Sequence, residues 1–324
     1  MFGFLSENIA SKLYSACQFA FLKDGAASSG SYGTFSFGSI EKINDSTQFD
    51  LASLTKAIVT VPLFYSLFSS KEILPADEIS RFLGGSGKEI TLYELLSHTS
   101  GFPAWLPFYK LVSAGKSLEE RKKETEKIIF EHKTSEKTKC YSDLNYLLLG
   151  FILEKIFNQP LDLIFRDFNK INGLDSRLTF DPENETPETA FSEMRKVFPE
   201  RSVEDENSWF LGGKTGHAGL FGSASEIVSY FDKLLKTPWF FPIAQKLGFA
   251  GFDRPEGYDS NYGKSANPAS FGHLGFTGTA FLIDPDRKII AALLTNSTHP
   301  VPDKPERKER IKKTRQRFFD EVAL

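Results

Sequence analysis

The alternation of apolar and polar residues predicts strands at both ends of the chain. Residues 5–16 have apolar positions at helical spacing and predict an opening helix. Residues 18–23 and 31–40 then alternate as half-buried strands do, on either side of a stretch rich in Gly and Ser that predicts a turn. Near the other end, residues 280–283 and 288–295 are apolar and separated by D-P-D-R, so we expect an antiparallel hairpin.

The middle of the chain is mostly helical by the same criterion. Residues 79–83 and 92–97 predict short helices, 119–131 a charged surface helix and 144–157 a strongly apolar, buried helix. The acidic stretch 181–206 contains prolines and predicts a long irregular connection.

Strands at both ends with helices between them predict an α+β fold, in which an antiparallel sheet is flanked by helices and an all-helical domain is inserted. The strand pattern resumes after Gly219, and residues 304–322 predict a closing helix whose basic face is either solvated or bound to an acidic partner. If the terminal strands share one sheet, residues 1–52 and 207–324 form a discontinuous sheet domain and 53–206 a mostly helical one. We expect a cleft at their junction, where residue 53 lies.

The candidate chemistry begins with Ser53 and Lys56, in the segment F-D-L-A-S-L-T-K-A-I-V-T. Its apolar positions favour a helix, on which residues three apart share a face. A serine hydroxyl attacks carbonyls only when a base takes its proton, and a lysine can do so if burial or nearby charge lowers its pKa. Asp50 is placed to cap this helix. An isolated S-x-x-K pair is more typical of a solvated helix face, so the case depends on further stretches.

Three further stretches carry candidate chemistry. Tyr141, in Y-S-D, can act as a base or proton shuttle near a lysine, although a tyrosine packed at a helix start is the alternative. The stretch G-H-L-G-F-T-G-T can bring backbone N–H groups to an oxyanion, and its His273 can bind a carboxylate or carbonyl; a glycine-rich turn with a structural histidine is the alternative. For His98, in L-L-S-H-T-S-G-F-P, we prefer a structural role that ties a loop to a helix end.

Composition excludes several classes of function. The 324 residues are 40% hydrophobic and 25% charged with a net charge of −3, which is ordinary for a globular protein and gives no field that favours nucleic acid. Two cysteines are too few for a disulfide framework, and the five histidines lack metal-ligand spacing, so we expect no metal and no cofactor. The first ten residues do not look like a signal peptide, and no apolar run is long enough for a membrane span. We therefore expect a cytoplasmic protein with no membrane partner, or a periplasmic one if a leader was removed.

Together and in this order, the segments resemble the serine β-lactamase and penicillin-binding protein superfamily, and most of all its class C-like branch. The resemblance covers nearly the whole chain, and the matching pieces are S-L-T-K at 53–56, L-L-S-H-T-S-G-F-P at 95–103, Y-S-D at 141–143, V-E-D-E-N…L-G-G-K-T-G-H-A-G-L-F at 203–221, H-L-G-F-T-G-T at 273–279 and L-L-T-N at 293–296. The resemblance implies a β-lactamase/transpeptidase-like fold, with a sheet built from both chain ends and an all-helical domain. That fold agrees with the class inferred from the pattern alone.

The resemblance also implies a role for each matching residue. Ser53 would be the acylated nucleophile, Lys56 and Tyr141 would share the proton transfers, and the backbone N–H groups of Ser53 and Phe276 would form the oxyanion hole. The substrate-binding residues would be Asp143, His273, Gly275 and Thr277. Trp105 is a further candidate because aromatic walls suit sugar or peptide groups, although loop packing explains it equally well.

Two departures from the family pattern change the expected chemistry. The family's Y-x-N triplet is Y-S-D here; an ionised Asp143 only accepts hydrogen bonds, and it favours a charged Lys56, which shifts the role of base towards Tyr141. His273 stands where a lysine is usual and gives a weaker, pH-dependent positive charge. Both changes argue against efficient hydrolysis of antibiotics.

We therefore expect a serine hydrolase that works through an acyl-enzyme on an amide bond of peptidoglycan-derived fragments, as a muramoyl-peptide amidase or a D-peptidase. The 203–221 segment, with S-H-T-S-G-F-P-A-W, resembles a sub-branch linked to cell-wall turnover that includes N-acetylmuramoyl-L-alanine amidases. A carboxylesterase of the same branch is one alternative, and a catalytically silent binding protein on this scaffold is another. The expected partner is a small muropeptide-like substrate, and the expected state is a monomer.

Overall fold

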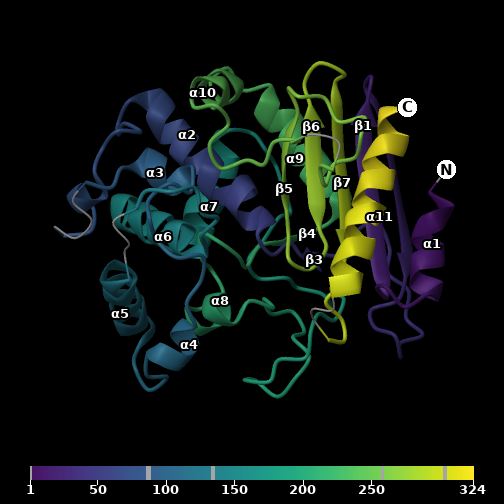
Figure 1. Cartoon of the computed structure of the whole chain (residues 1–324), viewed down its shortest axis with the longest axis horizontal. Coiled ribbons are helices and arrows are strands. Elements are labelled where there is room, and N and C mark those ends of the chain that lie inside the picture. Colours follow the sequence, from purple (N-terminus) through teal and green to yellow (C-terminus); the bar gives the residue numbers. More distant parts are fainter. Residues whose placement is uncertain (1, 85–88, 133–135, 257–258, 302–304) are drawn as a thin grey trace.

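The computed structural model describes residues 2–84, 89–132, 136–256, 259–301 and 305–324 (Figure 1). Its main sheet has five antiparallel strands in the order β2-β1-β7-β6-β5. These strands are β1 (Ala16–Lys23), β2 (Ala26–Gly33), β5 (Phe271–Leu274), β6 (Ala280–Asp284) and β7 (Ile289–Thr295). Because β1 pairs with β7, strands from the two ends of the chain share one sheet.

Helices cover both faces of this sheet because its central strands are apolar on both. Successive side chains of a strand point to opposite faces, so a strand buried on both sides has no polar face. One face packs on α9 (Ala224–Leu235), and the other on α1 (Gly3–Ala10) and α11 (Pro305–Ala323). The side chains of β7 divide between the two faces. Ile290, Ala292 and Leu294 belong to the core shared with α9. Ile289, Ala291 and Leu293 belong to the core shared with α1 and α11.

The other helices gather beside the sheet, and Figure 1 shows them on the side away from both chain termini. They are α2 (Val61–Ser70), the 3-10 helix η2 (Ile79–Arg81), α3 (Leu92–Leu96), α4 (Phe108–Leu111), α5 (Leu118–Glu131), α6 (Asp143–Phe157), α7 (Leu161–Ile171), α8 (Glu206–Phe210) and α10 (Phe240–Lys246). Every residue from Leu144 to Leu153 in α6 is buried, whereas α5 buries only Thr125 and Ile129. The predictions of a buried and a charged surface helix are both confirmed.

The prediction of strands is wrong in two places, and the opening helix expected at 5–16 is the shorter α1, which ends at Ala10. The strand expected at 31–40 is β2, which lies mostly in the stretch interpreted as a turn. β2 is an edge strand made of small residues, so it has no apolar alternation, and Gly30 leaves space for the ring of Phe19, which lies 2.7 Å from the position of an added Cβ. Second, after Gly219 only the short β4 (Phe221–Gly222) precedes two helices, α9 and α10, before the sheet resumes.

The division into domains at residues 52/53 and 206/207 stays a prediction. None of the helices in the described part of the chain combines the length and the apolarity needed to cross a membrane.

Candidate active site

Ser53 lies in a turn between the short strand β3 (Phe49–Asp50) and a helical segment that begins at Leu54. Asp50 fixes this turn, because its Oδ1 accepts a hydrogen bond from the Ala52 N–H at 2.8 Å. Ala52 has a φ of 47°, which is uncommon for a residue with a side chain. The predicted helix therefore begins later than expected, and Asp50 supports the turn instead of capping a helix.

Lys56 opens a π-helical turn, Lys56–Thr60, that leads into α2, and its side chain is fully buried. Its Nζ lies 2.8 Å from Ser53 Oγ, 2.8 Å from Asp143 Oδ1 and 3.2 Å from the carbonyl oxygen of His217. Three acceptors match the three N–H bonds of an ammonium group. Burial alone lowers the pKa of Lys56, but the Asp143 carboxylate and then Tyr141 outweigh it, so the pKa is raised. Lys56 is therefore charged in the resting site.

Tyr141 and Asp143 come from the start of α6. The Asp143 N–H donates to the carbonyl oxygen of Ala104 at 2.9 Å, and the Lys56 ammonium lies 5.0 Å from the centroid of the Tyr141 ring. Burial raises the pKa of the Tyr141 phenol, and its contacts with Lys56 and Ser53 lower it only in part. The resting phenol is therefore neutral, so of the two roles expected for Tyr141 that of proton shuttle fits and that of base does not.

His98 has the structural role that we preferred for it. Its Nδ1 accepts a hydrogen bond from the Ser142 N–H at 3.0 Å, and its ring packs on Tyr141 with 4.6 Å between centroids. Burial lowers the pKa of His98 to about 3, with Lys56 as the next cause, so the imidazole is neutral. This contact holds the Y-S-D segment in place.

The carbonyl group that accepts the third ammonium hydrogen belongs to His217, and two glycines let its segment approach α6. An added Cβ on Gly150 would lie 2.8 Å from the backbone nitrogen of Gly216, so a larger residue does not fit there. The His217 ring is fixed as well, with Nε2 3.0 Å from Asp205 Oδ1 and Nδ1 2.9 Å from Thr215 Oγ1. The position of the carbonyl oxygen is therefore set by packing and by side-chain hydrogen bonds together.

The turn between β5 and β6 brings Phe276 into the site. Within the described structure the N–H groups of Ser53 and Phe276 donate to no acceptor, whereas those of Gly275 and Gly278 do. Ser53 and Phe276 line the same cleft. Both N–H groups are therefore open to a ligand oxygen, the role predicted for them.

Gly275 and Thr277 hold this turn against the chain that precedes Ser53. The buried Thr277 hydroxyl donates to the carbonyl oxygen of Asp50 at 3.0 Å. An added Cβ on Gly275 would lie 2.0 Å from Thr279 Oγ1 and 2.9 Å from the carbonyl oxygen of Leu51. Both residues line the cleft, but packing alone accounts for them, and contact with a substrate stays a prediction.

His273, on β5, is buried and neutral. Its Nδ1 lies 2.8 Å from the carbonyl oxygen of Leu274, which only accepts, so we assign the proton to Nδ1 and leave Nε2 as an acceptor. Burial lowers the pKa of His273; Asp253 opposes this shift in part, and Lys56 adds to it. The expected imidazolium for a substrate carboxylate therefore does not form near neutral pH.

Three successive acidic residues, Glu204, Asp205 and Glu206, also line the cleft. Asp205 accepts the hydrogen bond from His217, and Glu206 pairs with Arg195 at 3.2 Å. Burial raises the pKa of Asp205, but His217 outweighs it, so the pKa is lowered and Asp205 is ionised. Burial raises the pKa of Glu204 to about 8, so Glu204 is largely neutral at pH 7, and Asp205 gives this wall its negative charge.

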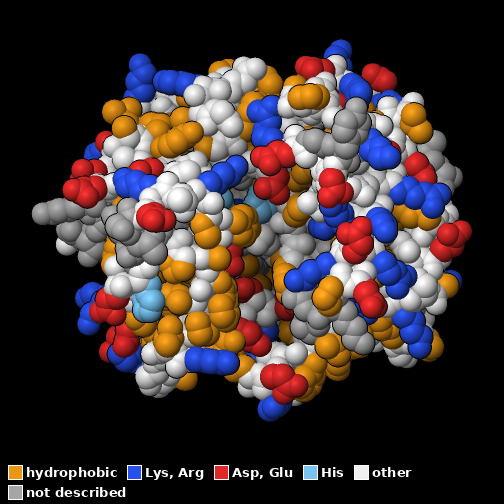
Figure 2. All heavy atoms as spheres, viewed as in Figure 1, with side chains coloured by type: hydrophobic (Ala, Val, Ile, Leu, Met, Phe, Trp, Pro, Cys, Tyr) orange, Lys and Arg blue, Asp and Glu red, His pale blue; other side chains and the backbone are white. Residues whose placement is uncertain are grey.

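These side chains surround one cleft of about 750 Å³, which Figure 2 shows as a hollow with acidic side chains in and around it. Trp105, 45% exposed, and Phe276, 57% exposed, add aromatic surface to it. The cleft lining in the described chain includes five carboxylate residues and no lysine or arginine: Asp143, Glu204, Asp205, Glu206 and Asp253. No group of His, Cys and acidic residues suited to a metal ion occurs among the residues that the structure describes.

Sequence reasoning missed four of these acidic residues. The V-E-D-E-N motif marked Glu204, Asp205 and Glu206 without indicating that they face the nucleophile. Asp253 belongs to no motif and reaches the site because its backbone pairs with Gly272 on β5. Only the fold brings it to the cleft.

Comparison with known proteins identifies the family of this chain. The model of the Beta-lactamase family matches residues 16–316. An N-acetylmuramyl-L-alanine amidase of Bacillus subtilis (strain 168) is 31% identical over 316 residues, covering 82% of this chain and 71% of that protein. The provisionally named D-alanyl-D-alanine carboxypeptidase of Escherichia coli (strain K12) is 28% identical over 314 residues, covering 81% of this chain and 72% of that protein.

A solved structure shows the same fold at lower identity. The class C beta lactamase from Rhodobacter sphaeroides superposes with a TM-score of 0.68 at 14% identity, covering 98% of this chain and 97% of that one. The family match extends over most of the chain, and the amidase relative exceeds 30% identity. The chain therefore belongs to the β-lactamase family and is a serine hydrolase.

Proposed function

We propose that this enzyme hydrolyses an amide bond of a peptidoglycan fragment through an acyl-enzyme on Ser53. The observation that carries the proposal is the position of Ser53 Oγ, 2.8 Å from Lys56 Nζ and at the wall of the cleft. The N–H groups of Ser53 and Phe276 would hold the oxyanion. The name of the Bacillus subtilis relative supports the amide between a muramoyl group and alanine as the target bond.

A charged Lys56 accepts the serine proton only if it gives one of its own away, and Asp143 is the acceptor that the geometry favours. Asp143 Oδ1 lies 2.8 Å from Lys56 Nζ, is shielded from solvent, and accepts no other hydrogen bond in the described structure. Asp205, in contrast, accepts hydrogen bonds from the Ser208 N–H and from His217, and its pKa is lowered. Such bonds stabilise the ionised form and weaken a carboxylate as a base.

Ser53 Oγ attacks the carbonyl carbon, its proton moves to Lys56 Nζ, and Lys56 passes a proton to Asp143 Oδ1. The C–N bond breaks as the leaving nitrogen takes a proton from the neutral Tyr141 phenol, and Asp143 restores that proton through Lys56. Water then attacks the ester and gives its proton to Tyr141, while the Tyr141 proton passes through Lys56 to Asp143. As the ester bond breaks, Ser53 Oγ takes a proton from Lys56, which Asp143 restores, and the acid and free Ser53 are released.

The cleft favours a muramoyl amide over a terminal D-alanyl peptide. A carboxypeptidase has to bind a free carboxylate next to the scissile bond, which calls for a cation. Lys56 is committed to three acceptors and His273 is neutral. The exposed rings of Trp105 and Phe276 and the carboxylates around them instead suit the apolar faces and hydroxyl groups of a sugar.

A panel of four substrates tests the proposal: a muramoyl-L-alanyl peptide, a D-Ala-D-Ala peptide, a short acyl ester and a cephalosporin. We expect the fastest turnover of the muramoyl peptide, none by Ser53→Ala, and a fluorophosphonate adduct on Ser53 in the intact-protein mass. Faster hydrolysis of the ester would favour a carboxylesterase. The absence of both label and turnover would favour a silent binding protein.

A further inference from the structure

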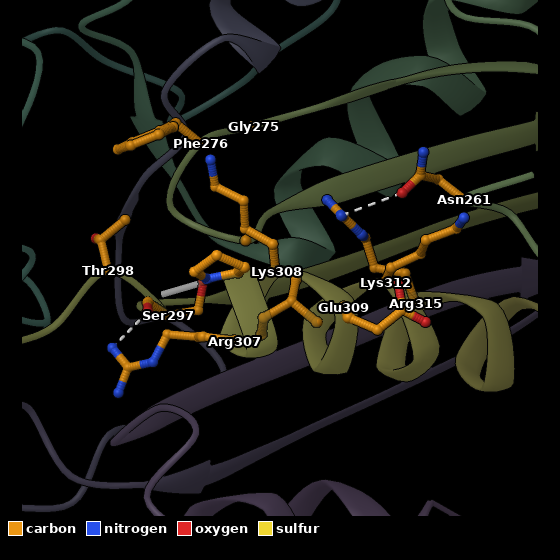
Figure 3. A pocket seen from close by; sticks show the side chains of 13 residues that line it. Asn261, Gly275, Phe276, Ser297, Thr298, Arg307, Lys308, Glu309, Lys312 and Arg315 are labelled. Atoms are coloured by element: carbon orange, nitrogen blue, oxygen red, sulfur yellow. Dashed lines mark hydrogen bonds between the residues drawn. The ribbon is translucent and has the colours of Figure 1, made fainter. Parts of the chain in front are cut away.

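A second pocket, which we call the α11 pocket, shares Gly275 and Phe276 with the cleft and has a volume of about 450 Å³ (Figure 3). Most of its lining comes from residues 305–315 at the start of α11. Figure 3 shows the side chain of Lys308 extending from α11 towards Phe276. A ligand held over Ser53 could therefore reach around Phe276 into this pocket.

The two cavities carry opposite charge. The α11 pocket is lined by four basic residues and one acidic residue, Glu309; the basic residues are Arg307, Lys308, Lys312 and Arg315. The cleft lining has five acidic residues and, within the described chain, no lysine or arginine. Lys56 compensates Asp143, and Arg195 compensates Glu206. Burial raises the pKa of Glu204 to about 8, so the unbalanced negative charge of the cleft comes from Asp205 and Asp253. An anionic part of a substrate is therefore repelled by the cleft and attracted by the pocket next to it.

Arg315 is incompletely compensated in the protein as it stands. One of its N–H groups donates to Asn261 Oδ1 at 3.2 Å, while Nε is shielded from solvent and has no hydrogen-bond partner in the described structure. Burial lowers the pKa of Arg315 to about 10, and Tyr262 and Asp253 offset only part of that effect. A shielded cation with few partners is costly, and the charge of an anion bound close to it would offset part of that cost.

The other basic residues differ in how firmly they are held. Arg307 is structural, because it donates to the carbonyl oxygens of Ser297 and His299 at 2.9 Å each. Lys312 pairs at 2.6 Å with Asp259, whose side chain is 90% exposed. Exposed pairs contribute little free energy, so Lys312 can exchange Asp259 for a ligand at small cost.

We propose that the α11 pocket binds an anionic group of the substrate, a carboxylate or a phosphate, while the scissile amide lies over Ser53. This inference rests on the proposed function and states where the charge of the peptidoglycan fragment is held. In such a fragment the carboxylates belong to the peptide, several bonds beyond the scissile amide. A phosphate on the sugar is the other source of the same chemistry.

The kinetic test compares a muramoyl peptide that has free carboxylates with the same peptide in amidated form. We expect Lys312→Glu and Arg315→Gln to lower kcat/KM for the free acid about tenfold or more, and to leave the amidated substrate within twofold. Lys313→Glu is the matched control, because Lys313 is 70% exposed on the same helix and does not line the pocket. Equal losses on both substrates, or none on the free acid, would overturn the proposal.

A binding arm separates this inference from the proposed function. Ser53→Ala protein, with and without Lys312→Glu, is titrated with the free-acid peptide, its amidated form and inorganic phosphate, and thermal unfolding verifies that each variant is folded. If the free-acid peptide binds more tightly than its amidated form, and Lys312→Glu removes this difference, the pocket is a carboxylate subsite. If phosphate binds and Lys312→Glu removes its binding, the pocket is a phosphate subsite. If Lys312→Glu weakens neither, the α11 pocket is not an anion subsite even when muramoyl peptides are hydrolysed. If it weakens one while no muramoyl peptide is hydrolysed, the subsite stands and the amidase proposal fails.

Discussion

Replacing Asp143 by Asn tests whether the serine proton passes through Lys56 to a carboxylate. The change keeps the size of the side chain and removes its charge. Two unit charges 4 Å apart in an effective dielectric of about 20 interact by about 4 kcal/mol. Asp143 Oδ1 lies 2.8 Å from a fully buried ammonium, and the aspartate side chain is only 21% exposed, so an effect of this order is reasonable.

The loss of that interaction makes Lys56 a titrating group. Since about 1.4 kcal/mol corresponds to one pKa unit, Asp143→Asn should lower the pKa of Lys56 by about 3, and burial acts in the same direction. The serine proton then has only a neutral Lys56 to go to. We expect kcat/KM of the variant at pH 7 to fall about 100-fold or more, and to recover about tenfold per pH unit as Lys56 loses its proton.

The assay is a pH–rate profile from pH 6 to 10 with a muramoyl peptide. Asp162→Asn is the matched control, since Asp162 pairs with Lys214 at 2.7 Å outside the cleft. This control should leave the shape of the profile unchanged. If Asp143→Asn raises KM alone and keeps the wild-type profile, Asp143 binds the substrate and takes no part in proton transfer, which would refute the relay.

Three other predictions concern single residues of the site. Tyr141→Phe keeps the ring and removes the donor for the leaving group, so we expect kcat to fall about 100-fold for amides and much less for activated esters, measured as the amide-to-ester ratio. His273→Lys should restore a cation beside the nucleophile and increase turnover of a D-Ala-D-Ala peptide relative to the muramoyl peptide; an unchanged ratio would remove His273 from substrate selection. Burial raises the pKa of Glu204 to about 8, and the Thr298 hydrogen bond lowers it only in part, so the folded protein binds more protons than the unfolded chain between about pH 4.5 and 8. Stability should therefore fall as the pH rises through this range. Glu204→Gln should flatten the dependence of Tm on pH and increase the free energy of unfolding at pH 8 by on the order of 2–4 kcal/mol. Parallel Tm–pH curves for the wild type and the variant would contradict the raised pKa of Glu204.

The parts of the structure that the sequence predicts well are those set by local periodicity. The hairpin of β6 and β7, the charged α5 and the apolar α6 each show their burial in their own residues. The contact of Ser53 and Lys56 is predictable for the same reason, since residues three apart meet on any helical turn. β2 is not, because small residues on an edge strand are held by pairing with β1 and not by an apolar face.

Protonation states cannot be predicted from the sequence because they depend on contacts between distant segments. Y-S-D suggested a charged lysine, but the commitment of Lys56 to three acceptors requires His217, which arrives through the close approach of Gly150 and Gly216. The neutrality of His273 depends on its burial and on a hydrogen bond to a carbonyl oxygen. Neither the third acceptor of Lys56 nor the neutrality of His273 is indicated by residues nearby in the sequence.

The two departures from the family pattern act together on the charge around the nucleophile. A lysine and an asparagine at the positions of His273 and Asp143 would leave two uncompensated positive charges next to the scissile bond, counting Lys56. Here Asp143 cancels the charge of Lys56 and His273 adds none, so the immediate site is neutral and the acidic wall makes the cleft negative. A substrate that suits this cleft brings its carbonyl carbon to Ser53 without a neighbouring carboxylate and carries its negative charge farther away. The basic lining of the α11 pocket lies on the other side of Phe276, where such a charge would be compensated. We therefore expect charge placement, more than the nucleophile that the family shares, to select the substrate of this enzyme.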